Sequence, residues 1–288
     1  MTVRLGAVGY LNARPLVYGL DRSPRFSLRF DVPSTCAALL HDGAIDVGLI
    51  PSIEYLRGGP YSIVPDLAIA SRGPVASVML YAARPMSDVR SIAMDVSSRT
   101  SVALVRVLCA RLFKISPAVE SAGPDLAAML ERCDAALIIG DNALFQSPVG
   151  SRQSAVGSRQ SALPSPESRA TSHEPRVEAI DLGEAWTGLT GLPFVYAFWA
   201  GRPGGLAAAD VAALQQARDA GVAASDEVAR QYLRDAPERQ AVGARYLRDN
   251  IRYYLGDEER AGLELFYRYA AEIGLAPAAG TLRFYRQA

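Results

Sequence analysis

The chain has 288 residues, half of them hydrophobic, which suits one large or two medium-sized domains with a substantial core. Its 30 basic and 30 acidic residues balance, so no basic field exists to hold nucleic acid by its phosphates. No stretch approaches the roughly 20 apolar residues of a membrane span, and the N-terminus lacks the pattern of a signal peptide. We expect a cytoplasmic protein that binds neither nucleic acid nor membrane.

The N-terminal part alternates strands with helices. We predict strands at residues 3–9, 26–32 and 45–50, and helices at 14–20 and 33–40. Ser34 or Thr35 is a plausible cap for the second helix, and Gly43 is expected to end it. Such alternation is typical of a parallel, doubly wound sheet, in which ligands bind beyond the carboxyl ends of the strands.

A second α/β unit follows. We predict strands at 63–70, 75–83, 92–96 and 135–139, and helices at 102–113 and 126–133. Residues 147–176 differ, because they repeat VGSRQSA and carry few apolar side chains, and we predict a disordered surface insertion there. Order is expected again at 177–182, followed by an apolar strand at 194–200 and by helices from residue 206.

This order predicts a bilobal protein. We expect two α/β domains joined by two crossing strands, 75–83 and 193–200, with a helical C-terminal tail. Domain 1 would comprise residues 1–82 and 198–288, and domain 2 residues 83–197. A cleft between two domains is the usual place for a small-molecule site.

The residues that usually hold metals are few. Cys36, Cys109 and Cys133 stand far apart in predicted helices, with no CxxC or Cys/His cluster, so no zinc site is expected. His41 lies near a helix end and His173 in the low-complexity segment, which argues against a Ser-His-Asp triad or a Cys-His dyad. Nucleotide-binding glycine motifs are absent from the sequence. We predict no cofactor and no metal.

The turn Ser97-Ser98-Arg99-Thr100-Ser101 is the strongest candidate for anion binding. A strand end passes there into a helix whose first turn offers free N–H groups and the positive end of the dipole. The hydroxyls add donors, and Arg99 can grip a carboxylate through two hydrogen bonds. Simple capping of the helix by Ser97 or Ser98 is the alternative.

Other polar residues stand at the ends of the predicted strands. Asn12 either caps the first helix or contacts a ligand, and the two roles are compatible. Ser77 and Ser52 either bond to the backbone or face the cleft. Asp141 is a base, an orienting carboxylate, or simply a turn residue.

Several motifs, taken together and in order, resemble the chorismate dehydratase family of the futalosine route to menaquinone. They cover nearly all of the chain outside residues 147–176. They are VGYLNARPL (8–16), VPS (32–34), DVGLIPSIEY (46–55), GPVASV (73–78), DVSSRTS (95–101), IGD (139–141), DLGEAW (181–186) and TGLPFV (190–195).

The resemblance implies a periplasmic-binding-protein-like fold of type II that serves as an enzyme. It implies conversion of chorismate to 3-[(1-carboxyvinyl)oxy]benzoate by loss of water without a cofactor. On this hypothesis, Asn12 and Ser77 hydrogen-bond the enolpyruvyl carboxylate or the leaving hydroxyl. The base is either the substrate's own side-chain carboxylate or Asp141. The substrate-binding residues would be Ser52, Ser97, Ser98, Arg99, Thr100 and Ser101.

Non-catalytic binding of a small carboxylate on the same fold is the alternative function. Such a protein would be expected to carry a signal peptide or a lipidated cysteine, and the sequence shows neither pattern. The oligomeric state stays open at this point.

Overall fold

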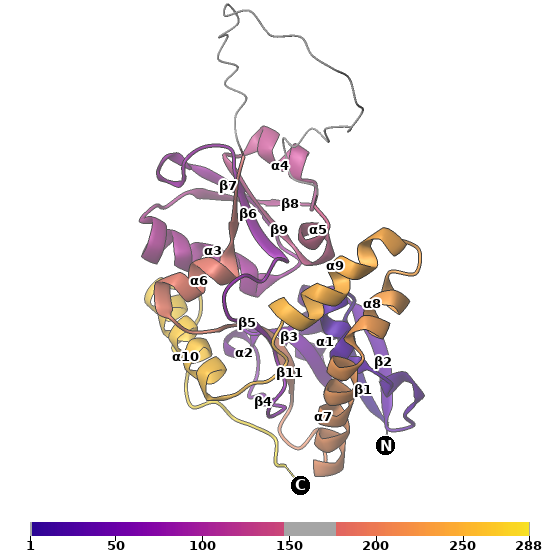
Figure 1. The fold of residues 1–288 in the computed structure, drawn as a ribbon. Coiled ribbons are helices and arrows are strands. Elements are labelled where there is room, and N and C mark those ends of the chain that lie inside the picture. The colour runs from indigo at the N-terminus through magenta and orange to yellow at the C-terminus, as the bar shows by residue number, and fades with distance from the viewer. Residues whose placement is uncertain (1, 147–176, 288) are drawn as a thin grey trace, which may run out of the picture.

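The computed structural model describes residues 2–146 and 177–287, which form two lobes, each built on one β-sheet (Figure 1). We call them the first lobe and the second lobe in chain order. The insertion expected at 147–176 lies outside the described residues. No helix within the described ranges is long and apolar enough to cross a bilayer.

The sheet of the first lobe has six strands in the order β2-β1-β3-β11-β4, with β5 also paired to β11. The strands are β1 (Val3–Val8), β2 (Phe26–Asp31), β3 (Val47–Pro51), β4 (Ser62–Ile63), β5 (Ile69–Ser71) and β11 (Phe194–Gly201). The strand expected at 63–70 is therefore two short strands. Pro65 has no N–H to give to a sheet, and Asp66 has a φ of 61°, so the extended chain is interrupted between them.

The sheet of the second lobe has five strands in the order β10-β6-β9-β7-β8. They are β6 (Val78–Ala82), β7 (Ser91–Asp95), β8 (Ala118–Ala122), β9 (Ala135–Ile139) and β10 (Glu178–Asp181). Strand β8 was not predicted, because it lies at the edge of the sheet and its side chains are mostly exposed.

Both sheets are mixed, which corrects the expectation of a parallel sheet. Strands β1, β2 and β3 are parallel, as are β7, β8 and β9. Strand β11 runs antiparallel to β3, and β6 runs antiparallel to β9. The reversal follows from the chain path, since β6 opens the second lobe and β11 returns from it.

The chain changes sheet at residues 72–77 and again at 191–193, just before the strands that were expected to cross. The boundaries at 82 and 198 stay predictions, although β6 already pairs within the second sheet. The Asp181 carboxylate fixes the first crossing, because it accepts hydrogen bonds from Val75 N at 3.0 Å and Ala76 N at 2.7 Å. It also caps α6 (Leu182–Thr190), a helix absent from the predicted elements.

Two expected helix caps in the first lobe differ from the structure. A 3₁₀ helix spans Leu11–Val17, so Asn12 lies inside it and does not cap it. Helix α1 (Pro33–His41) begins at Pro33, as predicted, but among the described residues no side chain caps it, so Ser34 and Thr35 are helical residues. The fixed φ of proline suits the first position of a helix, so the cap position falls on Val32. Gly43 follows α1 with a φ of 72°, as expected.

The other helices surround the two sheets (Figure 1). Helix α3 begins at Arg99, three residues before the predicted start, with Ser98 as its cap. Helices α7, α8 and α9 lie along the first lobe, whereas α10 packs on β11 and α3. These helices are α2 (Glu54–Arg57), α3 (Arg99–Leu108), α4 (Leu126–Arg132), α5 (Gly140–Leu144), α7 (Ala208–Ala223), α8 (Ser225–Tyr232), α9 (Gln240–Arg245) and α10 (Asp257–Glu272), with a π turn at Tyr246–Asn250.

Candidate active site

A cavity of about 40 Å³, room for roughly three water molecules, lies where the two lobes meet. Its walls come from the end of β1, the crossing at 72–77, the start of α3, the end of β9 and the middle of β11. Among the residues that the structure describes, no charged side chain lines it. Its polar lining residues are Tyr10, Asn12, Ser77, Ser98, Ser101 and Tyr196.

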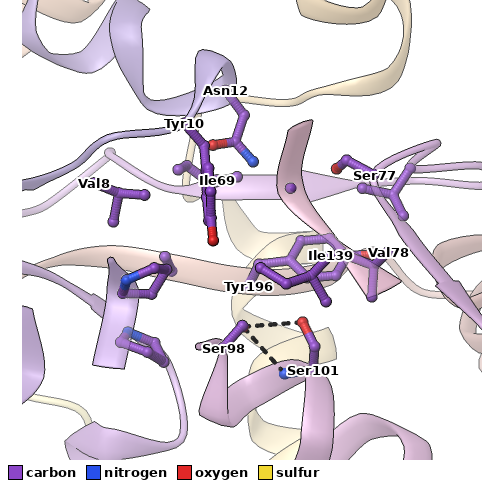
Figure 2. Close-up of a pocket in the computed structure, with 15 residues that line it drawn as sticks. Val8, Tyr10, Asn12, Ile69, Ser77, Val78, Ser98, Ser101, Ile139 and Tyr196 are labelled. Atoms are coloured by element: carbon purple, nitrogen blue, oxygen red, sulfur yellow. Dashed lines mark hydrogen bonds between the residues drawn. The ribbon is translucent and has the colours of Figure 1, made fainter. Parts of the chain in front are cut away.

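Four of the sequence-predicted site residues therefore share one cavity: Asn12, Ser77, Ser98 and Ser101. In Figure 2, Asn12 stands at the top of the view and Ser98 and Ser101 at the bottom, with Ser77 at the side. They come from three stretches of chain that the fold brings together at the junction of the lobes. The carboxyl ends of β1 and β7, each within the parallel part of its sheet, both lie at this junction.

Asn12 presents an unused acceptor. Its Oδ1 atom is buried and has no hydrogen-bond partner among the described residues. The Asn12 side chain also interacts with the phenol of Tyr246, and this interaction opposes the effect of burial on the pKa of that phenol. A buried acceptor without a partner is costly, so this oxygen is suited to a ligand group that donates a hydrogen bond.

Ser77 closes the back of the cavity. It is 1% exposed, and its Oγ accepts a hydrogen bond from the Tyr246 hydroxyl at 2.7 Å. The residue before it, Ala76, has a φ of 60°, a conformation unusual for a residue other than glycine. The bonds from the crossing to Asp181 hold this conformation and thereby set the direction of the Ser77 side chain.

Sequence reasoning missed Tyr246. It lies in the π turn after α9, 169 residues from Ser77 along the chain, and the surrounding helices are typical of packing segments. No local pattern marks it as a site residue, because its partners come from other elements.

The start of α3 forms the opposite wall. The Ser98 Oγ accepts from Ser101 N at 3.4 Å and lies 3.0 Å from the Ser101 Oγ (Figure 2). Free N–H groups and the positive end of the helix dipole lie at this end of α3. This wall is therefore suited to an anionic group, as the turn predicted.

Ser97, Thr100 and Ser52 lie outside the cavity lining, and their hydroxyl groups bond to other protein atoms. The Ser97 hydroxyl donates to Asp95 at 2.6 Å and lies 3.3 Å from the Tyr10 hydroxyl. The Thr100 Oγ1 accepts from Ile53 N at 3.1 Å. The Ser52 hydroxyl donates to the Val195 carbonyl oxygen at 2.8 Å. Ser97 and Thr100 thus connect the lobes, and Ser98 rather than Ser97 caps α3.

Arg99 lies outside the cavity lining, and its guanidinium bonds the Glu54 carboxylate at 2.6 Å. Its role in substrate binding stays a prediction. Glu54 is 2% exposed and also bonds His41 and Arg57, both at 3.1 Å. Burial raises the pKa of Glu54, but the bond to His41 and the charge of Arg99 outweigh it, so the net pKa is lowered.

Asp141 lies outside the cavity lining, at the start of α5. Its two carboxylate oxygens accept from Leu11 N at 3.1 Å and from the Tyr232 hydroxyl at 2.5 Å. Both partners belong to the first lobe, so this carboxylate connects the lobes. Burial raises its pKa, with the Tyr232 hydrogen bond in opposition. The position does not support Asp141 as a base acting inside the cavity.

Comparison with known proteins agrees with this architecture. A crystal structure of a protein from Archaeoglobus fulgidus has a TM-score of 0.69 at 15% identity and covers 95% of this chain and 98% of its own. The alkanesulfonate-binding protein SsuA of Xanthomonas axonopodis pv. citri has a TM-score of 0.60 at 17% identity, with 96% and 94% covered. These likenesses show a periplasmic-binding-protein-like fold.

Sequence comparison gives the family. A chorismate dehydratase of Thermus thermophilus is 31% identical over 264 residues, which are 91% of this chain and 93% of the relative. The family model for menaquinone biosynthesis matches residues 3–272. Because the match spans the strands, the crossings and the cavity walls described above, this chain belongs to the menaquinone biosynthesis family.

Proposed function

We propose that this protein is a chorismate dehydratase that converts chorismate to 3-[(1-carboxyvinyl)oxy]benzoate and water. One observation carries the proposal. Asn12, Ser77 and the start of α3 meet in a single cavity, in a chain that is 31% identical to a chorismate dehydratase over 91% of its length.

The start of α3 supports binding of a dianion. Chorismate carries two carboxylates, and no charged side chain lines the cavity. Backbone N–H groups at the first turn of α3, together with the Ser98 and Ser101 hydroxyls, are the donors that would hold one carboxylate. Neutral donors aimed at an anion in a site without water need no counter-charge close by.

The reaction balances without a protein base. The proton on the ring carbon that bears the enolpyruvyl ether moves to the enolpyruvyl carboxylate of the substrate. The C–H electron pair completes the aromatic ring, and the C–O electron pair leaves with the hydroxyl oxygen. That oxygen takes up the abstracted proton and departs as water. The protein's task is to orient the substrate and to exclude bulk water.

Substrate entry requires the lobes to separate. A cavity of about 40 Å³ is smaller than a ring that carries two carboxylates. The two crossings at 72–77 and 191–193 are the segments about which the lobes would move. Opening admits chorismate, and closing brings Asn12 and Ser77 of one wall toward the start of α3.

The decisive experiment is incubation of the purified protein with chorismate alone, followed by mass detection. We expect a product one water lighter than chorismate. Binding of chorismate without this product would favour the alternative, a non-catalytic carboxylate-binding protein of the same fold.

We also propose that the protein works in the cytoplasm. All three cysteines are buried and free, which is the usual state in a reducing compartment. Cell fractionation that placed the protein outside the cytoplasm would contradict this location.

A further inference from the structure

Tyr246 links the two polar residues on the cavity wall opposite α3. It is buried, its hydroxyl donates to the Ser77 Oγ at 2.7 Å, and an interaction with the Asn12 side chain lowers the pKa of its phenol against the effect of burial. It comes from the C-terminal helical region, whereas Asn12 and Ser77 come from the 3₁₀ helix 11–17 and the first crossing. Side chains from three distant segments therefore meet around the Tyr246 hydroxyl.

The direction of this chain is set by which atoms can donate. Burial raises the pKa of Tyr246, so its phenol keeps its proton and must donate it to an acceptor. Within the described residues, the acceptor found for it is the Ser77 Oγ. With that oxygen accepting, the proton of Ser77 is left for another partner.

The same reasoning orients Asn12. The interaction with Asn12 lowers the pKa of Tyr246, as a hydrogen-bond donor does, so we assign the amide NH₂ as the end of Asn12 that faces the phenol oxygen. The Oδ1 end then faces elsewhere, and it is the buried oxygen without a hydrogen-bond partner. The wall thus offers one free hydrogen-bond donor on Ser77 and one free acceptor on Asn12.

We propose that Tyr246 is a positioning residue that makes Ser77 a donor and Asn12 Oδ1 an acceptor, so that together they hold one hydroxyl group of the substrate. A hydroxyl both donates and accepts, so it would close a ring of four hydrogen bonds, from Asn12 to Tyr246, to Ser77, to the substrate and back to Asn12. This inference rests on the proposed function, in which the hydroxyl lost from chorismate is the group held.

The arrangement suits the departure of that hydroxyl. As the C–O bond breaks, its electron pair goes to the oxygen, and the hydrogen bond from Ser77 strengthens as negative charge grows there. The oxygen then takes the proton abstracted from the ring carbon and leaves as water. Tyr246 neither gains nor loses a proton overall, and it acts by keeping Ser77 turned toward the leaving group.

The test is Tyr246→Phe, which keeps the ring and removes only the hydroxyl. We expect kcat with chorismate to fall about tenfold or more, with KM changed less than about threefold, because the lost bond matters most when charge develops. Tyr253→Phe is the matched control. Tyr253 is equally buried, and its hydroxyl has no hydrogen-bond partner among the described residues, so its removal should change kcat less than about twofold.

A double variant separates positioning from packing. If Tyr246 acts mainly through Ser77, then adding Tyr246→Phe to Ser77→Ala should lower kcat by a much smaller factor than Tyr246→Phe lowers it in the wild type. Provided that the wild-type protein dehydrates chorismate, two results would overturn the inference. One is a Tyr246→Phe enzyme with the kcat of wild type. The other is a double variant whose kcat falls by the product of the two factors measured for the single variants. Wild-type protein that does not dehydrate chorismate would remove the proposed function and this inference together.

Discussion

At the scale of residues, the hydrogen-bonding capacity of the cavity depends on a few polar atoms, of which Asn12 Oδ1 is one. It is a buried acceptor without a protein partner, in a helix that the residue was expected to cap. The neighbouring position of Ser77 depends on the unusual backbone of Ala76, which the Asp181 carboxylate stabilises. Small polar side chains, held by buried neighbours, thus replace the charged groups that a dianion usually meets.

Removing the Asn12 amide should stop turnover. Asn12→Ala deletes both ends of the amide group and removes the acceptor proposed for the substrate hydroxyl, so we expect kcat to fall by about a hundredfold or more. Product formation is measured by mass detection, and circular dichroism checks the fold. Asn142→Ala is the control, because Asn142 is exposed and lines no wall of the cavity. Retained turnover in Asn12→Ala would exclude Asn12 from the mechanism.

The Asp141→Asn variant tests whether Asp141 is the catalytic base or only a contact between the two lobes. Because Asp141 connects the lobes outside the cavity, we expect kcat at saturating chorismate to stay within about threefold of wild type. KM should rise, since Asn has one acceptor oxygen for two donors. Asp134→Asn is the control, because Asp134 accepts from Arg90 N and Ser91 N inside the second lobe only. A loss of about a thousandfold in kcat with chorismate binding intact would make Asp141 the base.

At the scale of elements, the first turn of α3 lines the cavity, whereas the first turn of α2 forms a cluster of ion pairs. The start of α3 faces the cavity with hydroxyls and N–H groups, whereas Arg99 in the same turn points to α2. Glu54 of α2 collects His41, Arg57 and Arg99 around one buried carboxylate, so this cluster joins α1, α2 and α3. The contact between Glu54 and Arg99 spans the two lobes.

The Glu54 cluster predicts acid sensitivity. The pKa of Glu54 is lowered by folding from its ordinary 4.5, so its stabilising contribution is present above about pH 4.5 and is lost as the pH falls through the lower folded value. At pH 7, Glu54→Gln should lower the free energy of unfolding by about 3 kcal/mol, and the difference should shrink at acid pH.

Urea unfolding of both proteins at several pH values measures this difference. Glu120→Gln is the control, because the exposed pair of Glu120 with Arg132 should contribute less than about 1 kcal/mol. A Glu54→Gln deficit that is equal at all pH values would show that lost packing rather than lost charge is responsible.

At the scale of the whole molecule, closure is held by a few polar contacts between the lobes. The Asp141 carboxylate meets Leu11 and Tyr232, Arg99 meets Glu54, and the Ser34 N–H donates to the Ser97 carbonyl oxygen at 3.0 Å. Contacts of this kind are individually worth a few kcal/mol at most, so closed and open forms can exchange during turnover.

Tyr232→Phe should shift this equilibrium toward the open form. It removes the bond to the Asp141 carboxylate, and the loss of a bond to a charged group corresponds to about a tenfold change in an equilibrium constant. We expect KM for chorismate to rise about tenfold with little change in kcat. Small-angle scattering should show a larger radius of gyration for the variant, which decreases when chorismate is added. An unchanged KM and radius would show that this contact does not control closure.

The sequence by itself determined the local features of the protein. The apolar runs, Pro33, Gly43 and the polar turns are read from neighbours in the chain, and they predicted most strands and the polar turn that starts α3. The order of the motifs also predicted the family, because each motif is a short continuous stretch of sequence. The pieces of structure it missed, such as β8 and α6, are those whose side chains follow no clear period.

The tertiary structure alone decided which polar groups are free. The sequence predicts ligand contacts equally for Ser98, Arg99 and Thr100, which share one turn. Of these three residues, only Ser98 lines the cavity. Arg99 forms a hydrogen bond with the buried Glu54 carboxylate, and Thr100 accepts a hydrogen bond from the Ile53 N–H of the other lobe. Tyr246 joined the site from far along the chain. The reason is physical: a polar side chain takes the nearest partner in space, and the packing of the two lobes chooses that partner.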